Sequence, residues 1–373
     1  MVLVSVVILN YNGKHFLRAC IDALQRQTLQ DFEILLVDNA STDGSAEFVE
    51  ARYPDLMSAK RLRVIRNKTN VGFAEGNNVG HRAARGEYVV LLNNDTKVSP
   101  RWLEKLVEAM RLPSWRGKRV MIAGGLWGDR GSRERMRGMV ERRKRTFTIN
   151  LCGEVVYAPQ RADERGRRVV TSFYAVGLSE MYRRKEFRAP FDGDYFINAE
   201  DVQQCWLSHL RGGIVVMALD AWVAHYGGGA QRDIKAINRL AVFHGTKNQI
   251  INYLTFYEKK NLLRIAPLML VTQCAHVVQN PRKLLVKMKA YWWILRNLGR
   301  IMRKRKAIQS QRKVPDREII KEMSSVFYND EMAALLSGRG VRGISKAVLR
   351  ALNALFSAYC WAVRLRTREF CDT

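Results

Sequence analysis

Three places in the sequence carry side chains whose types and settings suit chemistry: Asp95, the pair Glu200-Asp201, and His225. Asp95 closes the run Asn93-Asn94-Asp95, directly after the apolar segment 88–92. The carboxyl ends of parallel strands are where an α/β sheet binds its ligand. A carboxylate there can hold Mg²⁺ or Mn²⁺ against a diphosphate, which predicts an enzyme with a phosphorylated substrate. Alternatively, Asp95 caps the helix expected near Pro100 or satisfies a turn.

Length and composition bound the architecture that must position these residues. The chain has 373 residues, and single cores stop growing at about 250–300 residues, so we expect one large domain with an appendage. Its 47% hydrophobic and 26% charged residues are typical of a folded protein. The six cysteines form no C-x-x-C pair, which favours neither a disulfide framework nor a zinc site and fits a reduced, cytoplasmic setting.

The formal net charge of +28 is concentrated in the segments 130–145 and 282–317. Such clusters indicate an anionic partner: a nucleic acid, an anionic membrane or a phosphorylated substrate. A nucleic-acid-binding protein is thus the alternative from another class, although the sequence has no helix-turn-helix, RNP aromatic motif or zinc-finger spacing. The charged stretch 129–145 is expected to form a mobile surface loop or a short exposed helix.

Neither end of the sequence predicts a membrane-spanning segment. The apolar start, residues 1–9, lacks a basic region and a cleavage site and is interpreted as a strand. The segment 265–278 is shorter than the about 20 residues that a spanning helix needs, and 347–363 contains Arg350.

The first 110 residues alternate strand and helix periods in the βαβ manner. The expected strands are 4–10, 32–37, 62–65, 88–92 and 120–123. Antiparallel strands are expected around 146–157 and 169–176, a helix at 202–211, and strands at 214–217 and 222–224. Beyond residue 239 the spacing is helical, and Pro267, Pro281 and Pro315 are expected to divide this region into separate helices.

Short motifs with a consistent order give the sequence a family resemblance. They are Val6-Val7-Ile8-Leu9-Asn10-Tyr11-Asn12, Val37-Asp38-Asn39-Ala40-Ser41-Thr42-Asp43-Gly44, Asn70-Val71-Gly72-Phe73-Ala74-Glu75-Gly76-Asn77-Asn78, Leu91-Leu92-Asn93-Asn94-Asp95, Glu200-Asp201-Val202 and His225. Residues 4–248 resemble a family 2 glycosyltransferase, most closely its rhamnosyltransferase-like branch. The resemblance implies an α/β fold of the GT-A type, a Rossmann-like nucleotide-diphospho-sugar transferase domain, with a C-terminal helical appendage.

The resemblance also implies a division of the chain. Residues 1–250 would be the catalytic domain, with a nucleotide-binding half at 1–110 and an acceptor-binding half at 111–250. Residues 251–373 would be a basic, amphipathic helical region.

The resemblance implies a UDP- or dTDP-sugar donor held by residues from the first four strands and the loops after them. The candidates are Asn10, Tyr11, Asn12, Asp38, Asn39, Asn70, Gly72, Phe73, Asn77, Asn94 and Asp95. A carboxylate at Asp38 can accept the N3 hydrogen of uracil or thymine, but Asp38 could instead form an Asx-turn or cap a helix. Asn10 and Asn12 could make a turn without a ligand, and Gly72 could serve a positive-φ turn instead of a close approach to the ligand.

A divalent cation, Mg²⁺ or Mn²⁺, is also implied. Asp95 would be its carboxylate ligand and His225 the second, although His225 could simply pack at a strand end. Asn93 stands where many GT-A enzymes have the first Asp of Asp-x-Asp, which leaves open whether the metal is obligatory.

Asp201 is the general base that the family pattern implies, and the reaction would invert the anomeric centre. Successive helical side chains diverge by about 100°, so Glu200 cannot face the same hydroxyl and is scaffold. The alternative is an acidic pair that favours the helix dipole. Glu200, Asp192, Asp194 and Trp206 are placed on the acceptor side, where Asp192 and Asp194 could also form a turn and Trp206 could be core. Lys247-Asn248 could help to bind the diphosphate.

The helical tail alternates apolar and basic residues from 283 to 305, as an amphipathic helix in an anionic membrane interface does. The alternative is a helix packed on the catalytic domain with a solvated basic face. We therefore expect an inverting glycosyltransferase at the inner membrane face, acting on a glycan or lipid-linked acceptor in surface glycan synthesis. A sugar nucleotidyltransferase is the alternative within enzymes, but strand one is not followed by a Gly-rich phosphate loop. The oligomeric state stays open.

Overall fold

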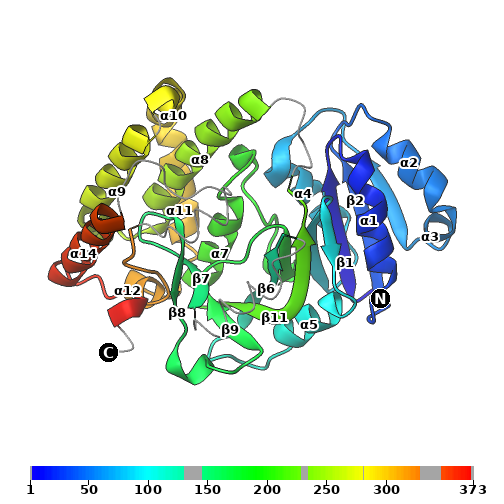
Figure 1. Ribbon diagram of the computed structural model, residues 1–373, viewed down its shortest axis with the longest axis horizontal. Coiled ribbons are helices and arrows are strands. Elements are labelled where there is room, and N and C mark those ends of the chain that lie inside the picture. Colours follow the sequence, from blue (N-terminus) through cyan, green and yellow to red (C-terminus); the bar gives the residue numbers. More distant parts are fainter. Residues whose placement is uncertain (1, 130–144, 228–233, 280, 328–345, 371–373) are drawn as a thin grey trace.

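The computed structural model describes residues 2–129, 145–227, 234–279, 281–327 and 346–370 (Figure 1). Most of the charged stretch 129–145 therefore lies outside the described residues. The strands are β1 (Val4–Asn10), β2 (Phe32–Asp38), β3 (Leu62–Arg66), β4 (Tyr88–Asn93), β5 (Thr96–Val98), β6 (Val120–Gly128), β7 (Arg145–Ile149), β8 (Val155–Pro159), β9 (Val169–Ser172), β10 (Ser179–Arg183) and β11 (Ile214–His225).

A mixed sheet forms the centre of the protein, with strand order β3-β2-β1-β4-β10-β6-β11-β5 and β9 paired to β11. The four predicted strands β1 to β4 are parallel, and Asn10 aligns with Asp38 at their carboxyl ends. Strand β10 was not predicted, and it enters antiparallel between β4 and β6. The two strands expected at 214–217 and 222–224 are one strand, β11, with a register shift between Ala218 and Trp222. The expected antiparallel pair at 146–157 is the hairpin β7–β8.

Helices cover both faces of the sheet because its central strands are apolar on both sides. The helices of the amino-terminal part are α1 (Lys14–Gln25), α2 (Ser45–Arg52), α3 (Pro54–Ser58), α4 (Gly72–Ala83), α5 (Trp102–Met110) and α7 (Glu200–Leu210). Val6 and Ile8 of β1 pack in one core with α1 and α5. Val7 points to the other face, into the core that contains α4, α7 and the C-terminal helices.

The C-terminal region is helical, as predicted. Its helices are α8 (Ile234–Phe256), α9 (Lys259–Gln279), α10 (Leu284–Arg296), α11 (Leu298–Gln309), α12 (Asp316–Ile320) and α14 (Lys346–Ala362). Helix α8 is continuous across residue 250, so the predicted domain boundary falls inside it, and the division into two domains stays a prediction. One prediction was wrong: Pro267 lies within α9 instead of ending a helix. The side chain of Leu263, four residues earlier, is exposed, so water can solvate the carbonyl that Pro267 leaves without a donor.

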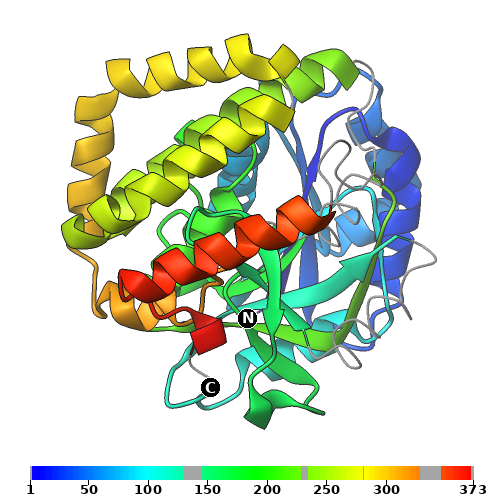
Figure 2. The ribbon, with the colours of Figure 1, turned by 60° about the vertical axis from the view of Figure 1, so that its left-hand side comes forward.

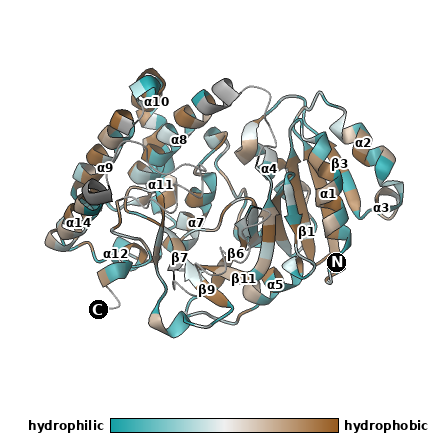
Figure 3. Ribbon diagram, viewed as in Figure 1, coloured by the Kyte–Doolittle hydropathy of each residue, from teal (hydrophilic) through white to brown (hydrophobic). Residues whose placement is uncertain are grey.

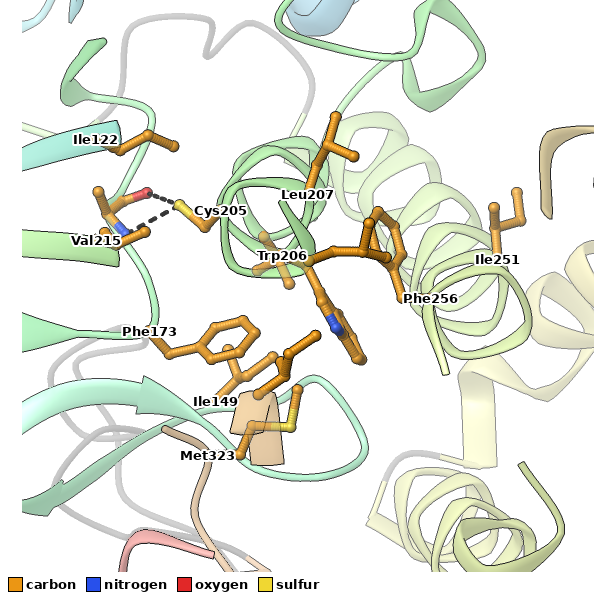
Figure 4. Close-up of a cluster of buried hydrophobic side chains, with 14 of the residues drawn as sticks. Ile122, Ile149, Phe173, Cys205, Trp206, Leu207, Val215, Ile251, Phe256 and Met323 are labelled. Atoms are coloured by element: carbon orange, nitrogen blue, oxygen red, sulfur yellow. Dashed lines mark hydrogen bonds between the residues drawn. The ribbon is translucent and has the colours of Figure 1, made fainter. Parts of the chain in front are cut away.

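The predicted acceptor-side residue Trp206 lies in the hydrophobic core (Figure 4). Its ring stacks on Phe256 of α8 with ring centres 5.1 Å apart and meets Phe173 and Tyr257 edge-on. Only 1% of the residue is exposed, so it cannot touch an acceptor. Trp206 instead joins α7 to α8, which is the core alternative weighed above.

A buried arginine, Arg368, holds the C-terminal residues against the rest of the protein. Arg368 is fully buried, and its Nε donates to the carbonyl of Pro159 at 2.8 Å. One terminal nitrogen donates to Thr171 at 3.1 Å and pairs with Glu164 at 3.3 Å, while the other lies 3.8 Å from Glu322. These contacts connect the C-terminal residues to β8 and β9.

We expect Arg368→Ala to lower the free energy of unfolding by about 3 kcal/mol, because it removes the buried cation of Glu164 and leaves this carboxylate only Arg116, 3.8 Å away, as a partner of opposite charge. Arg317→Ala is the matched control, since this side chain is exposed and such changes stay within about 0.5 kcal/mol. Urea unfolding of both variants measures the difference. Equal stability of the two variants would show that the C-terminal segment is not held in this way.

Candidate active site

The ends of β1, β2 and β4 bring three predicted donor residues into one hydrogen-bond network. The amide nitrogen of Asn10 donates to Asp38 Oδ1 at 3.2 Å and to Ser41 Oγ at 3.1 Å. The amide nitrogen of Asn94 donates to Asn10 Oδ1 at 2.7 Å. Asp38 Oδ2 also accepts from the backbone N–H of Ser41 at 3.1 Å, which is the Asx-turn alternative. Asn10, Asp38 and Asn94 thus form one buried polar edge.

Asn12 and Tyr11, two residues predicted to bind the nucleotide sugar, follow β1 and differ in their surroundings. Asn12 has φ 53°, and its side-chain oxygen accepts from the backbone N–H of Thr42 at 2.8 Å, which joins the loop after β1 to the loop after β2. The neighbouring ring of Tyr11 is exposed beside this edge. A side-chain ring in that position can cover the face of a bound base.

A second network joins the loop after β2 to the start of α4. Asn39 donates to Asn70 Oδ1 at 2.8 Å and to the carbonyl of Gly72 at 3.2 Å. Gly72 has φ 84°, and a Cβ there would come within 2.6 Å of the backbone oxygen of Phe196. The positive-φ alternative for this glycine is confirmed, and Phe196 is the group packed against it, while the close approach of a ligand stays a prediction. Asn77 is buried and donates to the carbonyl of Phe73 at 2.9 Å inside α4.

The two predicted metal ligands are in direct contact. His225 ends β11, and its Nε2 lies 3.2 Å from Oδ1 of the buried Asp95. The register of β11 on β5, which places His225 opposite Thr96, fixes this approach. The described ranges contain no group of three or more His, Cys, Asp and Glu side chains arranged to hold a metal. One carboxylate and one imidazole suit Mn²⁺ or Mg²⁺ if diphosphate and water oxygens complete the shell.

Asp201, the predicted base, is buried near the start of α7 and has three hydrogen-bond donors. Its Oδ2 accepts from the Tyr174 hydroxyl at 2.9 Å and from the backbone N–H of Gly177 at 3.1 Å. Its Oδ1 accepts from the N–H of Val202 at 2.8 Å. Burial raises the pKa of Asp201, and these three bonds oppose the shift because they favour the charged form.

Two more carboxyls, Glu200 and Glu180, lie near Asp201 without such support. Both oxygens of Glu180 and one of Glu200 have no hydrogen-bond partner within the part of the chain that the structure describes. Burial, followed by the nearby charge of Asp201, raises the pKa of each well above the usual range. Burial thus disfavours the charged forms of Glu180 and Glu200, whereas three donors favour the charged form of Asp201. This supports the division between a chemical carboxylate and a scaffold carboxylate.

The segment Gly177-Leu178 connects Asp201 to the metal-ligand pair. The N–H of Gly177 bonds Asp201, while the carbonyl of Leu178 accepts from the N–H of Asn93 at 3.4 Å, two residues before Asp95. A Cβ on Gly177 would lie 3.3 Å from the ring of Phe73 and 3.6 Å from Asp201 Cβ. The donor network and Asp201 thus meet at one edge of the sheet.

A strained loop leads into α7. Phe196, Asn198 and Ala199 have φ values of 48°, 71° and 64°, which non-glycine residues seldom adopt. The side-chain nitrogen of Asn248 donates to the carbonyls of Tyr195, Ile197 and Asn198 at 2.9, 3.0 and 2.7 Å. The carbonyl of Phe196 accepts from the first N–H groups of α4. Helix α8 thus holds the loop that sets Asp201 against α4.

Asp192 and Asp194 in the same loop are paired with basic side chains of α11. Lys304 contacts both carboxylates, and Arg300 lies 2.5 Å from Asp194. Lys247, proposed from sequence for the diphosphate, donates to the carbonyl of Asp194 at 2.6 Å, and burial lowers its pKa to about 8. In this structure Lys247 therefore stabilises the loop that contains Asp194.

Sequence reasoning missed Tyr174, Gly177 and Glu180. Tyr174 and Gly177 have no motif that marks them, because their roles depend on the position of β10. Glu180 carried a signal, since it is a lone carboxyl in the stretch 173–182, which is otherwise uncharged and mostly apolar.

Comparisons with known proteins agree with this geometry. Residues 5–156 match the family model "Glycosyl transferase family 2", which covers every predicted donor residue but ends before Asp201 and His225. Glycosyltransferase GlyG of Streptococcus pneumoniae is 35% identical over 109 residues, 29% of this chain and 35% of that protein. The uncharacterized glycosyltransferase EpsJ of Bacillus subtilis is 39% identical over 106 residues, 28% of this chain and 30% of that protein. The matched segment thus spans about a third of these relatives.

Solved structures show the fold. The crystal structure of GalNAc-T7 with UDP, GalNAc and Mn²⁺ has a TM-score of 0.55 at 16% identity, over 72% of this chain and 51% of that one. S. aureus TarS 1-349 in complex with UDP has a TM-score of 0.51 at 16% identity, over 96% and 92%. The chain has the GT-A fold, as predicted, and its first half is similar to family 2 glycosyltransferases. The rhamnosyltransferase-like branch stays a prediction.

We expect Tyr174→Phe to shift the acid limb of the pH–rate profile upward by about one to two units. A hydrogen bond to a charged group contributes about 1.5–3 kcal/mol, and one pKa unit corresponds to about 1.4 kcal/mol. The lost bond favoured the charged carboxylate, so the pKa of Asp201 rises and the base is protonated at higher pH. Tyr182→Phe is the control, because this buried hydroxyl bonds His81 instead. An unchanged pH–rate profile in Tyr174→Phe would show that the acid limb does not report the ionisation of Asp201.

Proposed function

We propose that this protein is an inverting glycosyltransferase that moves a sugar from a nucleoside diphosphate to an acceptor hydroxyl. One observation carries the proposal: a buried carboxylate with three hydrogen-bond donors, Asp201, lies at the same sheet edge as the Asp95–His225 pair. A base and a diphosphate site are the two parts that this transfer requires.

The proposed donor is a UDP- or dTDP-sugar. In this proposal the carboxylate of Asp38 accepts from the N3 hydrogen of the base, and the exposed ring of Tyr11 covers the face of the base. The family match over residues 5–156 supports the donor class, because it contains all of these residues. The complex of S. aureus TarS 1-349 with UDP supports it further. Which sugar is moved depends on pocket shape, and rhamnose is the proposal that follows from the motif resemblance.

Asp95 and His225 would hold the divalent cation. Their 3.2 Å contact and their mix of a carboxylate and an imidazole fit Mn²⁺ or Mg²⁺. When bound, such a cation supplies charge neutralisation for the departing nucleoside diphosphate. A protein of similar fold, GalNAc-T7, is known in complex with UDP, GalNAc and Mn²⁺, which supports this assignment.

Asp201 would take the proton from the acceptor hydroxyl. The hydroxyl oxygen then forms a bond to the anomeric carbon while the bond from that carbon to the diphosphate oxygen breaks. The proton ends on Asp201 and the bonding electrons on the leaving nucleoside diphosphate. Because the base faces the side opposite the leaving group, the configuration inverts. Burial disfavours the charged forms of Glu180 and Glu200, which limits any second negative charge near the reacting hydroxyl.

The acceptor would be the hydroxyl of a glycan or of a lipid-linked molecule. A matched relative, the cholesterol galactosyltransferase of Borreliella burgdorferi, is 37% identical over 103 residues, 28% of each chain. Its name supports a lipid as one acceptor class. Asp192 and Asp194, in the loop before Asp201, would border the acceptor on one side.

We expect Asp201→Asn to keep nucleoside diphosphate binding and to lower transfer by about 10²–10⁴-fold, the usual contribution of a general base. Calorimetry with UDP and a transfer assay on a panel of nucleotide sugars measure the two properties. The matched control is Asp220→Asn, because Asp220 lies in β11 and its carboxylate pairs with Arg168. Full transfer activity in Asp201→Asn would remove this residue from the base role.

We expect Asp95→Asn and His225→Ala to weaken the Mn²⁺-dependent part of UDP binding by at least about tenfold, since even outer-shell partners of a metal have this effect. Calorimetry with UDP, with and without Mn²⁺, separates the two parts. The affinity without metal should stay within about twofold of the unmodified protein. UDP affinity that does not respond to Mn²⁺ in the unmodified protein would contradict the metal assignment and leave the base assignment untouched.

A further inference from the structure

We propose that α9, α10 and α14 form a docking face for the surface of an anionic lipid bilayer, on which the protein lies without spanning it. This face is defined by the outward side chains of Leu270, Leu285, Trp292, Leu355 and Trp361. The inference goes beyond the transfer reaction and does not depend on it.

Large apolar side chains point to solvent along all three helices. On α10, Leu285 and Trp292 are 73% and 60% exposed, and on α14 Trp361 is 62% exposed. Leu263, Leu270 and Val278 on α9 are exposed as well. Soluble surfaces seldom gather apolar side chains in this way unless they meet a partner. Trp and Leu are also the side chains that interfacial helices insert at the headgroup boundary.

Each helix is firmly attached to the protein by its opposite side. Ile265, Leu268 and Met269 of α9 are buried in the core, together with Phe356 and Cys360 of α14. The exposed positions on α9 recur seven and eight residues apart, which places them on one face. The apolar outer surface is therefore a fixed feature of folded helices.

The three helices adjoin one another on the side away from β1 to β3. The Tyr359 hydroxyl of α14 donates to the carbonyl of Arg264 on α9 at 2.8 Å. The Tyr291 hydroxyl of α10 donates to Gln273 on α9 at 3.0 Å. Figure 2 shows α9 and α14 side by side across the outer surface, with α10 along one edge, and Figure 3 shows hydrophobic residues along α9 and α14.

The charge around this face selects an anionic partner. The sequence from Lys259 to Pro315 contains no Asp or Glu but has Lys or Arg at the start of α9, between α9 and α10, and along α10. Arg282, Lys289 and Arg296 are exposed beside the apolar positions. A second copy of the chain would bring the same positive charge against this face. A bilayer with anionic headgroups supplies both apolar depth and the opposite charge.

The packing of α9 favours lying on a membrane over crossing one. Its segment Lys259–Val278 has a length of 20 residues and a hydropathy of 1.3, which is enough to span a bilayer. However, one side of α9 is buried in the core and contacts α14, so the helix would have to leave the protein to cross. With only 28% of the segment buried, its other side is available to lipid.

Docking on this face would also orient the proposed site. Helix α11 follows α10 directly, and its Arg300 and Lys304 hold Asp194 and Asp192 in the loop before Asp201. The acceptor side is thus connected to the membrane face through one helix. This step, unlike the docking itself, rests on the proposed function.

The test is flotation of the full chain with vesicles of phosphatidylcholine alone or with phosphatidylglycerol. We expect flotation only with the anionic vesicles and release at high salt or in carbonate. Leu285→Glu/Trp292→Glu should lower vesicle binding at least about tenfold, with Leu240→Glu as the apolar control outside the face. Arg282→Glu/Lys289→Glu should do the same, with Arg52→Glu/Lys60→Glu as the charge-matched control. Circular dichroism and UDP affinity of every variant report folding and donor binding separately from docking.

Several outcomes would overturn the proposal. Equal flotation with neutral vesicles would remove the charge selection, and retained binding of Leu285→Glu/Trp292→Glu would remove the face. Resistance to carbonate would show a spanning helix. No flotation together with a dimer that Leu285→Glu/Trp292→Glu dissociates, measured by light scattering, would assign the face to a second copy of the chain. None of these results bears on transfer by Asp201, which the soluble donor assays measure.

Discussion

The site depends on keeping one carboxylate charged in a place that water hardly reaches. Burial opposes ionisation of Asp201, and only the donors on Tyr174, Gly177 and Val202 offset it. Glu180 and Glu200 lie in the same surroundings without three such donors, so burial and the charge of Asp201 disfavour their charged forms. The hydrogen bonds therefore select which of three carboxyls can act as a base. Strand β10 is essential to this selection, because it begins two residues after Gly177 and carries Glu180.

The position of Asp201 requires a backbone that the sequence alone does not favour. The loop before α7 contains three non-glycine residues with positive φ, each of which costs about 1–3 kcal/mol. Asn248 of α8 offsets this by binding three carbonyls of the loop, and Asn252 binds a fourth, that of Ala199. The helical appendage is thus part of the site, since it supplies the donors that hold the loop. The same two helices, α7 and α8, also meet in the hydrophobic core, where Trp206 stacks on Phe256 (Figure 4).

The sequence predicted those parts of the fold whose signals are local. The strands β1, β2 and β4 are apolar runs followed by polar turns, so both the parallel sheet and the edge that carries Asn10, Asp38 and Asp95 could be derived. Strand β10 has no such run, because Glu180 interrupts it, and its antiparallel insertion depends on pairing with β4 and β6. The prediction that Pro267 ends a helix was wrong for a related reason. A proline ends a helix unless its surroundings tolerate the lost hydrogen bond, and this depends on which side of α9 faces solvent.

Acidic and basic residues are concentrated in different parts of the molecule. Carboxylates gather where β4, β10 and α7 meet, and basic residues gather on α9 to α11, where the sequence from Lys259 to Pro315 has no acid. The two sets meet at one point, where Lys304 and Arg300 pair with Asp192 and Asp194. Each pair offsets the negative charge of a carboxylate in the loop before α7 with a cation of α11. These ion pairs therefore lower the negative potential near Asp201 and fasten α11 to this loop.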